Sequence, residues 1–124
     1  MIHIPISLGE LVDRVTILTI KHQMIKDDIK LRTIDAELDH LTYLLDTYEI
    51  NVSTFLFQKL YHINLSLWNI EDKIRSKEKL LEFDAEFIEL ARSVYMNNDL
   101  RYITKKEISD LDMTTRCSEQ KSYA

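Results

Sequence analysis

The chain has 124 residues, a net charge of −5 at pH 7, and one residue each of glycine, proline, cysteine and tryptophan. Its length fits one domain, its single cysteine excludes an internal disulfide framework, and its acidic balance disfavours double-stranded nucleic acid as a partner. Strand-rich folds need many glycines and prolines for their tight turns. We therefore predict an all-α fold, a single helical-bundle domain over residues 1–124.

No segment of the sequence approaches the roughly 20 apolar residues of a membrane span. The first residues also lack the basic start and apolar run of a secretion signal. We therefore expect a cytoplasmic protein with no membrane partner.

The first predicted helix begins at Ser7, after a short extended N-terminus, and runs to about Lys26. Ser7 and Glu10 have the spacing of a capping box, in which each side chain binds the backbone amide of the other. Gly9, the only glycine, lies in the first turn although glycine costs helix stability relative to alanine. A glycine at this position predicts that a neighbouring segment packs closely against the helix there. The alternative is that an anion binds at this first turn.

The second predicted helix begins at Asp27 or Asp28 and ends before residues 46–51. Its apolar side chains recur at alternating steps of three and four, a coiled-coil-like seam that is too short to stand alone. The seam consists of Leu31, Ile34, Leu38, Leu41, Leu45 and Tyr48.

Three further helices complete a predicted bundle of about five. The third begins at Ser53 and reaches about Leu80, and the fourth covers roughly residues 85–96 after an Asp84 cap. Residues 97–99, Asn-Asn-Asp, predict a turn that caps a fifth helix ending near residue 112. The residues from 113 onward show no helical period and are expected to form a C-terminal tail packed back on the bundle.

Two rows of side chains follow the third helix. One row is aliphatic and belongs to the core, whereas the other begins aromatic and becomes charged. The second row consists of Phe57, Tyr61, Asn64, Trp68, Glu71, Arg75 and Glu78. Aromatic faces stack on planar ligands, and arginine binds carboxylate or phosphate with a forked donor. The alternative is that the aromatic residues extend the core while Glu71 pairs with Arg75 across one helical turn.

Polar residues of the first helix and cations near the C-terminus extend this candidate site. Asp13 and Lys21 are expected to face Glu71, Arg75 or the tail. The full set of candidate ligand-binding residues is Gly9, Asp13, Arg14, Lys21, Tyr61, Asn64, Trp68, Glu71, Arg75, Arg92, Arg101, Lys105, Lys121 and Tyr123.

An alternative metal site consists of two acidic pairs, Glu86 with Glu89 and Glu107 with Asp110. A hairpin turning near residue 98 would bring the pairs level, as in helical pyrophosphohydrolases that hold Mg²⁺ against a triphosphate. The helical wheel instead turns Glu86 and Glu89 toward solvent, which favours an acidic surface. We therefore assign no catalytic residue, metal or cofactor, with Mg²⁺ expected only under this alternative.

Four segments carry a resemblance to a known family: "ISLGELVDRVTILTIK", "KLYHINLSLWNIEDKIRSKE", "FIELARSVYMNNDLR" and "EQKSY". They resemble an uncharacterised family of short helical proteins from bacterial and phage genomes, sometimes encoded beside surface-polysaccharide biosynthesis genes. The resemblance implies no activity. It implies that the family pattern includes Gly9, Glu10, Asp13, Thr16, Lys21, Tyr61, Asn64, Trp68, Glu71, Asp72, Arg75, Arg92, Tyr95, Asn98, Asp99, Arg101, Lys121 and Tyr123.

The sequence thus favours a non-catalytic, homo-oligomeric helical protein that binds a small anionic or nucleotide-like ligand. If the source is a phage, sequestration of a signalling nucleotide is a reasonable use of such a protein. One alternative is a Mg²⁺-dependent nucleotide pyrophosphohydrolase. The other is an accessory protein of surface-polysaccharide synthesis that docks through the apolar seam of the second helix.

Overall fold

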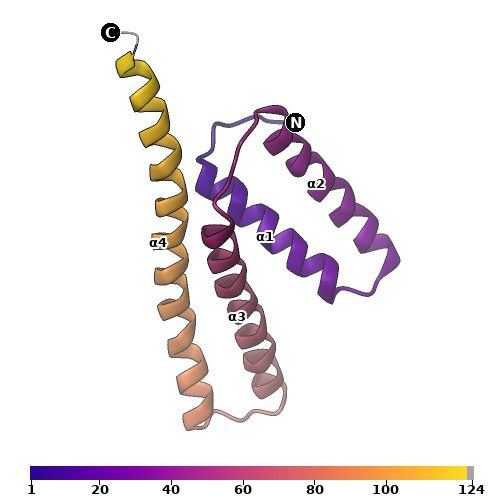
Figure 1. Cartoon of the computed structure of the whole chain (residues 1–124). Coiled ribbons are helices and arrows are strands. Elements are labelled where there is room, and N and C mark those ends of the chain that lie inside the picture. The colour runs from indigo at the N-terminus through magenta and orange to yellow at the C-terminus, as the bar shows by residue number, and fades with distance from the viewer. Residues whose placement is uncertain (123–124) are drawn as a thin grey trace.

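The described backbone is all-helical, as predicted, but it has four helices where the sequence suggested about five (Figure 1). The computed structural model describes the backbone of residues 1–122 and the side chains of residues 1–111. The helices are α1 (Leu8–Met24), α2 (Asp28–Thr47), α3 (Thr54–Lys79) and α4 (Ala85–Ser122).

Each helix begins directly after the residue that the sequence identified as its cap: Ser7, Asp27, Ser53 and Asp84. The Ser7 hydroxyl accepts a hydrogen bond from the Glu10 amide at 3.2 Å, which confirms one half of the predicted capping box. The Glu10 carboxylate, however, binds Lys105 of α4 at 2.6 Å. The first turn of α1 is therefore tied to α4 by the same residue that was expected to close its cap.

The prediction of a turn at residues 97–99 is wrong, because α4 continues through them as one helix. Asn97 stays within the helix by donating from Nδ2 to the Ser93 carbonyl oxygen, one turn earlier, at 2.8 Å. The expected helix end near residue 112 is also wrong, since the helical backbone extends to Ser122. Local turn propensity is overridden here because an unbroken α4 can pack along both α3 and α1.

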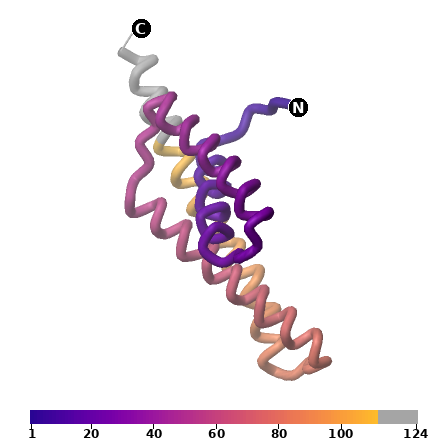
Figure 2. The backbone as a smooth tube through the Cα atoms, turned by 90° about the vertical axis from the view of Figure 1, so that its right-hand side faces the viewer, coloured from indigo at the N-terminus to yellow at the C-terminus, as the bar shows by residue number. Residues whose placement is uncertain are grey.

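Helix α1 is the centre of the arrangement. It contacts all three other helices, whereas α2 contacts only α1 within the described part of the chain (Figures 1 and 2). Helices α3 and α4 form a long antiparallel hairpin beside α1. A cluster of buried side chains joins α1, α3 and α4: Val12, Leu56, Leu60 and Ile108.

Two helix ends use the left-handed backbone conformation without glycine. Glu49 follows α2 with φ of 52°, and Leu81 follows α3 with φ of 56°. Glycine is the usual residue at such positions because a side chain there is strained. The amides of the next residues, Ile50 and Glu82, still close these ends by bonding to Leu45 and Lys77 carbonyl oxygens.

The only glycine has a different role. The Gly9 amide donates to the Ser109 hydroxyl at 2.9 Å, and a Cβ built on Gly9 would lie 2.8 Å from the Lys105 carbonyl carbon. Close packing of α1 on the α4 backbone therefore explains the glycine, and the alternative of an anion bound to the Gly9 amide is wrong.

No helix among the described residues is long and apolar enough to cross a membrane.

Candidate ligand-binding pocket

A buried polar network joins α1, α3 and α4 around Asp13. The Asp13 side chain is only 1% exposed, and Arg101 of α4 binds both of its oxygens. Arg101 Nε donates to Oδ1 at 2.9 Å and Nη2 donates to Oδ2 at 2.5 Å. This bidentate geometry gives arginine–carboxylate pairs both strength and direction.

Asn64 of α3 completes the network. Its Nδ2 donates to Asp13 Oδ1 at 3.0 Å and to Thr16 Oγ1 at 2.8 Å. The Thr16 hydroxyl in turn donates to the Asp13 carbonyl oxygen at 2.7 Å. Every buried side-chain nitrogen and oxygen among the described residues has a partner, so the network is fully satisfied.

Asp13 is held in its charged form. Burial opposes its ionisation, but hydrogen bonds from Arg101 and Asn64, together with the charges of Arg101 and Lys105, outweigh burial and lower the pKa of Asp13 below 3.8. Lys105 lies 3.7 Å from Asp13 Oδ2. The hydrogen bond to Asp13 likewise raises the pKa of Arg101 above its ordinary value. Asp13 and Arg101 therefore form an ion pair whose carboxylate is buried and whose guanidinium is partly exposed.

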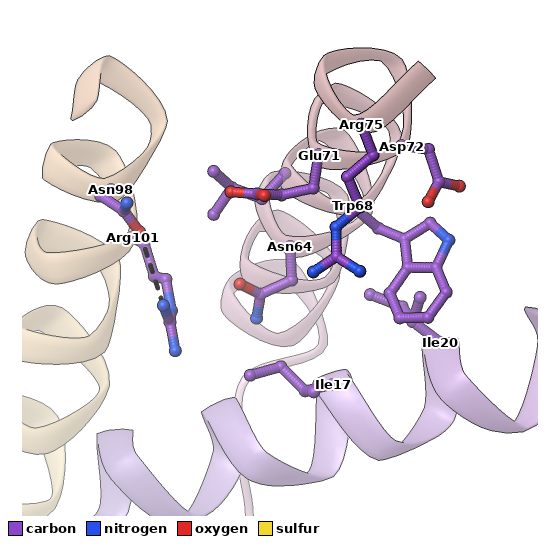
Figure 3. A pocket seen from close by; sticks show the side chains of 10 residues that line it. Ile17, Ile20, Asn64, Trp68, Glu71, Asp72, Arg75, Asn98 and Arg101 are labelled. Carbon is purple, nitrogen blue, oxygen red and sulfur yellow. Dashed lines mark hydrogen bonds between the residues drawn. The ribbon is translucent and has the colours of Figure 1, made fainter. Parts of the chain in front are cut away.

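A pocket of about 380 Å³ opens beside this network, where α1, α3 and α4 meet (Figure 3). Its volume lies within the range of small-molecule sites, about 300–1,000 Å³. Figure 3 shows Asn64 and Glu71 on the side of α3 that faces α4, and Trp68 and Asp72 on the other side of α3, above α1. The pocket is lined by Ile17, Ile20, Asn64, Leu67, Trp68, Glu71, Asp72, Arg75, Asn98 and Arg101.

The half-buried Trp68 and the exposed Arg75 belong to the row that the sequence singled out on the third helix. The alternative pairing of Glu71 with Arg75 does not occur, because neither residue takes part in an ion pair of the described residues. Arg75 has no carboxylate partner among the described residues, whereas Arg101 is neutralised by Asp13.

The structure brings five candidate residues to the pocket wall: Asn64, Trp68, Glu71, Arg75 and Arg101. Asp13 lies directly behind them, and its carboxylate binds Arg101, whereas the sequence suggested that it faces Glu71, Arg75 or the tail. The sequence did not indicate this pair, because the predicted break in α4 hid how Arg101 would face α1.

The remaining candidates lie elsewhere. Gly9 and Lys105 form the α1–α4 contact, and the Tyr61 hydroxyl donates to Gln23 Oε1 at 2.6 Å. None of these three lines the pocket. Nor do the exposed Arg14 and Arg92 or the half-buried Lys21. The side chain of Lys121 and the whole of Tyr123 lie outside the described residues.

Five residues that line the pocket were not among the ligand-binding candidates from the sequence. Ile17, Ile20 and Leu67 are apolar, and nothing in an apolar periodicity separates a pocket floor from a packed interior. Asp72 appeared only in the family pattern, and Asn98 only there and in the predicted turn at residues 97–99. Asn98 had a signal, because it stands three residues before Arg101 and its Oδ1 lies 3.5 Å from Arg101 Nη1 on the continuous helix.

The alternative metal site does not form within one chain. Glu89 and Glu107 lie on the same helix, 18 residues and therefore about 27 Å apart, so the predicted hairpin that would align the acidic pairs is absent. Glu86 binds Lys77 at 3.1 Å and Glu107 binds Lys59 at 3.5 Å. Nowhere in residues 1–111 do three histidine, cysteine, aspartate or glutamate side chains gather closely enough to hold a metal ion.

Comparison with family models, curated proteins and solved structures found no match to this chain. The resemblance to an uncharacterised helical family therefore stays a prediction.

Proposed function

We propose that the protein binds, without converting it, a small molecule that carries a planar ring and one anionic group. The observation that carries this proposal is a pocket bordered by the only tryptophan and by an arginine without a carboxylate partner among the described residues. An indole face stacks on a planar ring, and a free guanidinium binds a carboxylate or phosphate at two points.

The geometry of α3 supports joint contact with one ligand. Trp68 and Arg75 are seven residues apart, so they lie on one helical face with two turns between their Cα atoms. Long side chains of a helix point toward its N-terminus, which brings the Arg75 guanidinium back toward the indole. Figure 3 shows Arg75 extended in this direction.

The charges of the pocket limit the ligand. Glu71 and Asp72 lie in the lining with Arg75, the one cation there that has no ion-pair partner among the described residues. Because these groups carry a net negative charge, a ligand with several phosphates would be repelled. The two carboxylates would instead accept hydrogen bonds from hydroxyl or amino groups. A nucleoside monophosphate or an aromatic carboxylate with such donors fits this combination better than a triphosphate.

Intrinsic fluorescence provides a direct test, because Trp68 is the only tryptophan. We expect a saturable change in its emission on titration with members of a panel of nucleosides, nucleoside mono- and triphosphates, and aromatic carboxylates. The ligand should be recovered unchanged after incubation with Mg²⁺. Arg75→Gln should raise the Kd at least about tenfold, or about 1.4 kcal/mol, because it removes the charged donor.

Lys79→Gln is the matched control, since Lys79 is an exposed cation on the same helix that does not line the pocket. It should leave the Kd unchanged. No saturable change with any member of the panel, or equal losses in the two variants, would contradict the proposal. Turnover of a nucleotide in the presence of Mg²⁺ would favour the hydrolase alternative.

The accessory-protein alternative rests on the seam of α2. This seam is not freely available, because Ile34 is only 8% exposed and Leu38, Leu41 and Leu45 are half-buried. Since α2 contacts only α1 within the described residues, α1 provides that cover. The seam therefore offers a weaker basis for a function than the pocket.

A further inference from the structure

The part of the pocket between α3 and α4 carries polar side chains that a ring on Trp68 and an anion on Arg75 leave unused. Figure 3 shows Asn64 and Glu71 on the side of α3 that faces Asn98 and Arg101 of α4. These four side chains all line the pocket and form its polar corner.

Asn64 turns a hydrogen-bond acceptor toward the polar corner. Its side-chain nitrogen must face Asp13, because an ionised carboxylate only accepts hydrogen bonds. That nitrogen donates to Asp13 and to Thr16, which uses both of its hydrogens. The Asn64 Oδ1 atom has no partner among the described residues, although every sealed side-chain oxygen there has one. Oδ1 therefore borders open space, and the open space that Asn64 lines is the pocket.

Arg101 supplies hydrogen-bond donors to the same corner. A guanidinium has five N–H donors, of which two here bind Asp13 and a third lies near Asn98 Oδ1. Asp13 occupies the edge formed by Nε and Nη2. The terminal edge, with one N–H of Nη1 and one of Nη2, has no partner among the described residues. Because the Arg101 side chain is 30% exposed and lines the pocket, these two donors can reach a ligand.

The charges of the polar corner decide which chemical group fits it. Asp13 neutralises Arg101, and Glu71 is acidic, so the corner does not attract an anion. An ammonium group has donors only and would leave the Arg101 donors without an acceptor. An uncharged group that both accepts and donates satisfies Arg101 and Asn64 together. The lactam edge of a ring, with its carbonyl and N–H, and the hydroxyl of a sugar both have this property.

We propose that the polar corner recognises an uncharged group of the ligand that accepts a hydrogen bond from Arg101 and donates one to Asn64 Oδ1. This inference rests on the proposed function, since the ring and the anion of the same molecule bind at Trp68 and Arg75. It narrows the ligand to molecules that also carry a lactam edge or a sugar hydroxyl. Simple aromatic carboxylates are rejected, because they leave the polar groups of the corner without partners.

Two comparisons of nucleotides test this recognition and separate its two sources. Inosine monophosphate methylated on the lactam nitrogen lacks the ring N–H, and dideoxyinosine monophosphate lacks the sugar hydroxyls. Titration of the wild-type protein, followed by Trp68 fluorescence, gives a Kd for each analogue and for inosine monophosphate. We expect at least one analogue to bind at least about fivefold more weakly than the parent. The analogue that is affected identifies the lactam edge or the hydroxyl as the recognised group.

Replacement of asparagines assigns the discrimination to the polar corner. Asn64→Ala removes Oδ1 while Asp13 keeps its bonds to Arg101, so the ratio of the two Kd values should fall below about twofold. Asn69→Ala is the matched control, because Asn69 is an exposed asparagine of α3 that does not line the pocket, and it should keep the ratio. If circular dichroism shows that Asn64→Ala is unfolded, Asn98→Ala replaces it. Asn98 is exposed, and its loss frees the Arg101 terminal edge, so the ratio should at least halve.

The outcomes distinguish this inference from the proposed function. Equal Kd values for all three nucleotides, with binding still weakened by Arg75→Gln, would overturn the inference and leave the proposed function intact. A ratio that is unchanged in the folded asparagine variant of the corner would also overturn it, as would binding of aromatic carboxylates but of no nucleotide. Failure of every nucleoside, nucleotide and aromatic carboxylate to bind would overturn the inference and the proposed function together.

Discussion

Replacing the only glycine with alanine should destabilise the protein, although helix propensity alone predicts the reverse. A Cβ on residue 9 would lie 2.7 Å from the Ser109 hydroxyl oxygen and 2.8 Å from the Lys105 carbonyl carbon, whereas ordinary contacts begin near 3.4 Å. Ser109 has a side chain that can rotate, but the Lys105 carbonyl belongs to the backbone of α4. Gly9→Ala must therefore push the two helices apart.

The magnitude follows from three opposing contributions. Alanine gains about 1 kcal/mol of helix propensity over glycine. Overpacking at a tight contact costs about 1–3 kcal/mol, and loss of the Gly9–Ser109 hydrogen bond costs about 1 kcal/mol more. We expect a net loss of about 1–3 kcal/mol, which lowers the Tm by about 4–12 °C for a chain of this length.

Urea denaturation and differential scanning calorimetry would measure this change. Adding Ser109→Ala should not rescue Gly9→Ala, because the Lys105 carbonyl remains in place. Arg14→Ala, at an exposed position of α1, is the control and should change the free energy of unfolding by less than about 0.5 kcal/mol. A Gly9→Ala protein as stable as the wild type would refute the close α1–α4 contact.

Two further predictions concern the charge of Asp13 and the backbone strain at Leu81. The pKa of Asp13 is lower in the folded chain than its ordinary value near 3.8, so its contribution to stability is present above that pH and is lost as the pH falls toward the folded-state pKa. The free energy of unfolding, measured from pH 7 down into the acid range, should show this loss. Asp13→Asn should remove this pH dependence and lower the free energy of unfolding by about 3 kcal/mol at pH 7, because Arg101 loses its buried partner. Leu81→Gly should raise the free energy of unfolding in urea by about 0.5–1 kcal/mol, because Leu81 is strained at φ of 56° and its side chain is 74% exposed; an unchanged or lowered stability would contradict this.

Local features of the chain were predictable because local interactions decide them. Ser7, Asp27, Ser53 and Asp84 each cap the helix that follows, as their side-chain chemistry indicates. The row on α3 was predictable for the same reason, since a periodicity of 3.6 places Asn64, Trp68 and Arg75 on one face wherever that helix packs.

The continuation of α4 was not predictable from such rules. Residues 97–99 favour a turn on their own, and only packing against α3 and α1 keeps them helical. That error concealed the ion pair of Asp13 with Arg101, which joins residues 88 positions apart. A fifth helix capped by a turn at residues 97–99 would have placed Arg101 in its first turn, where a cation is unfavourable and a ligand contact is an attractive explanation.

The pairing of Arg101 with Asp13 changes what the pocket can recognise. An arginine bound at both oxygens of a carboxylate has little charge left for a ligand, so Arg101 holds α4 against α1 and shapes the wall. Recognition of an anion then depends on Arg75, which shares α3 with the tryptophan. One helix sets the spacing of Trp68 and Arg75. The distance between the ring and the anionic group of the ligand should therefore affect the Kd more than the chemical type of the anionic group does. A phosphate and a carboxylate at the same distance from a planar ring should therefore differ less in Kd than two monophosphates with different spacers.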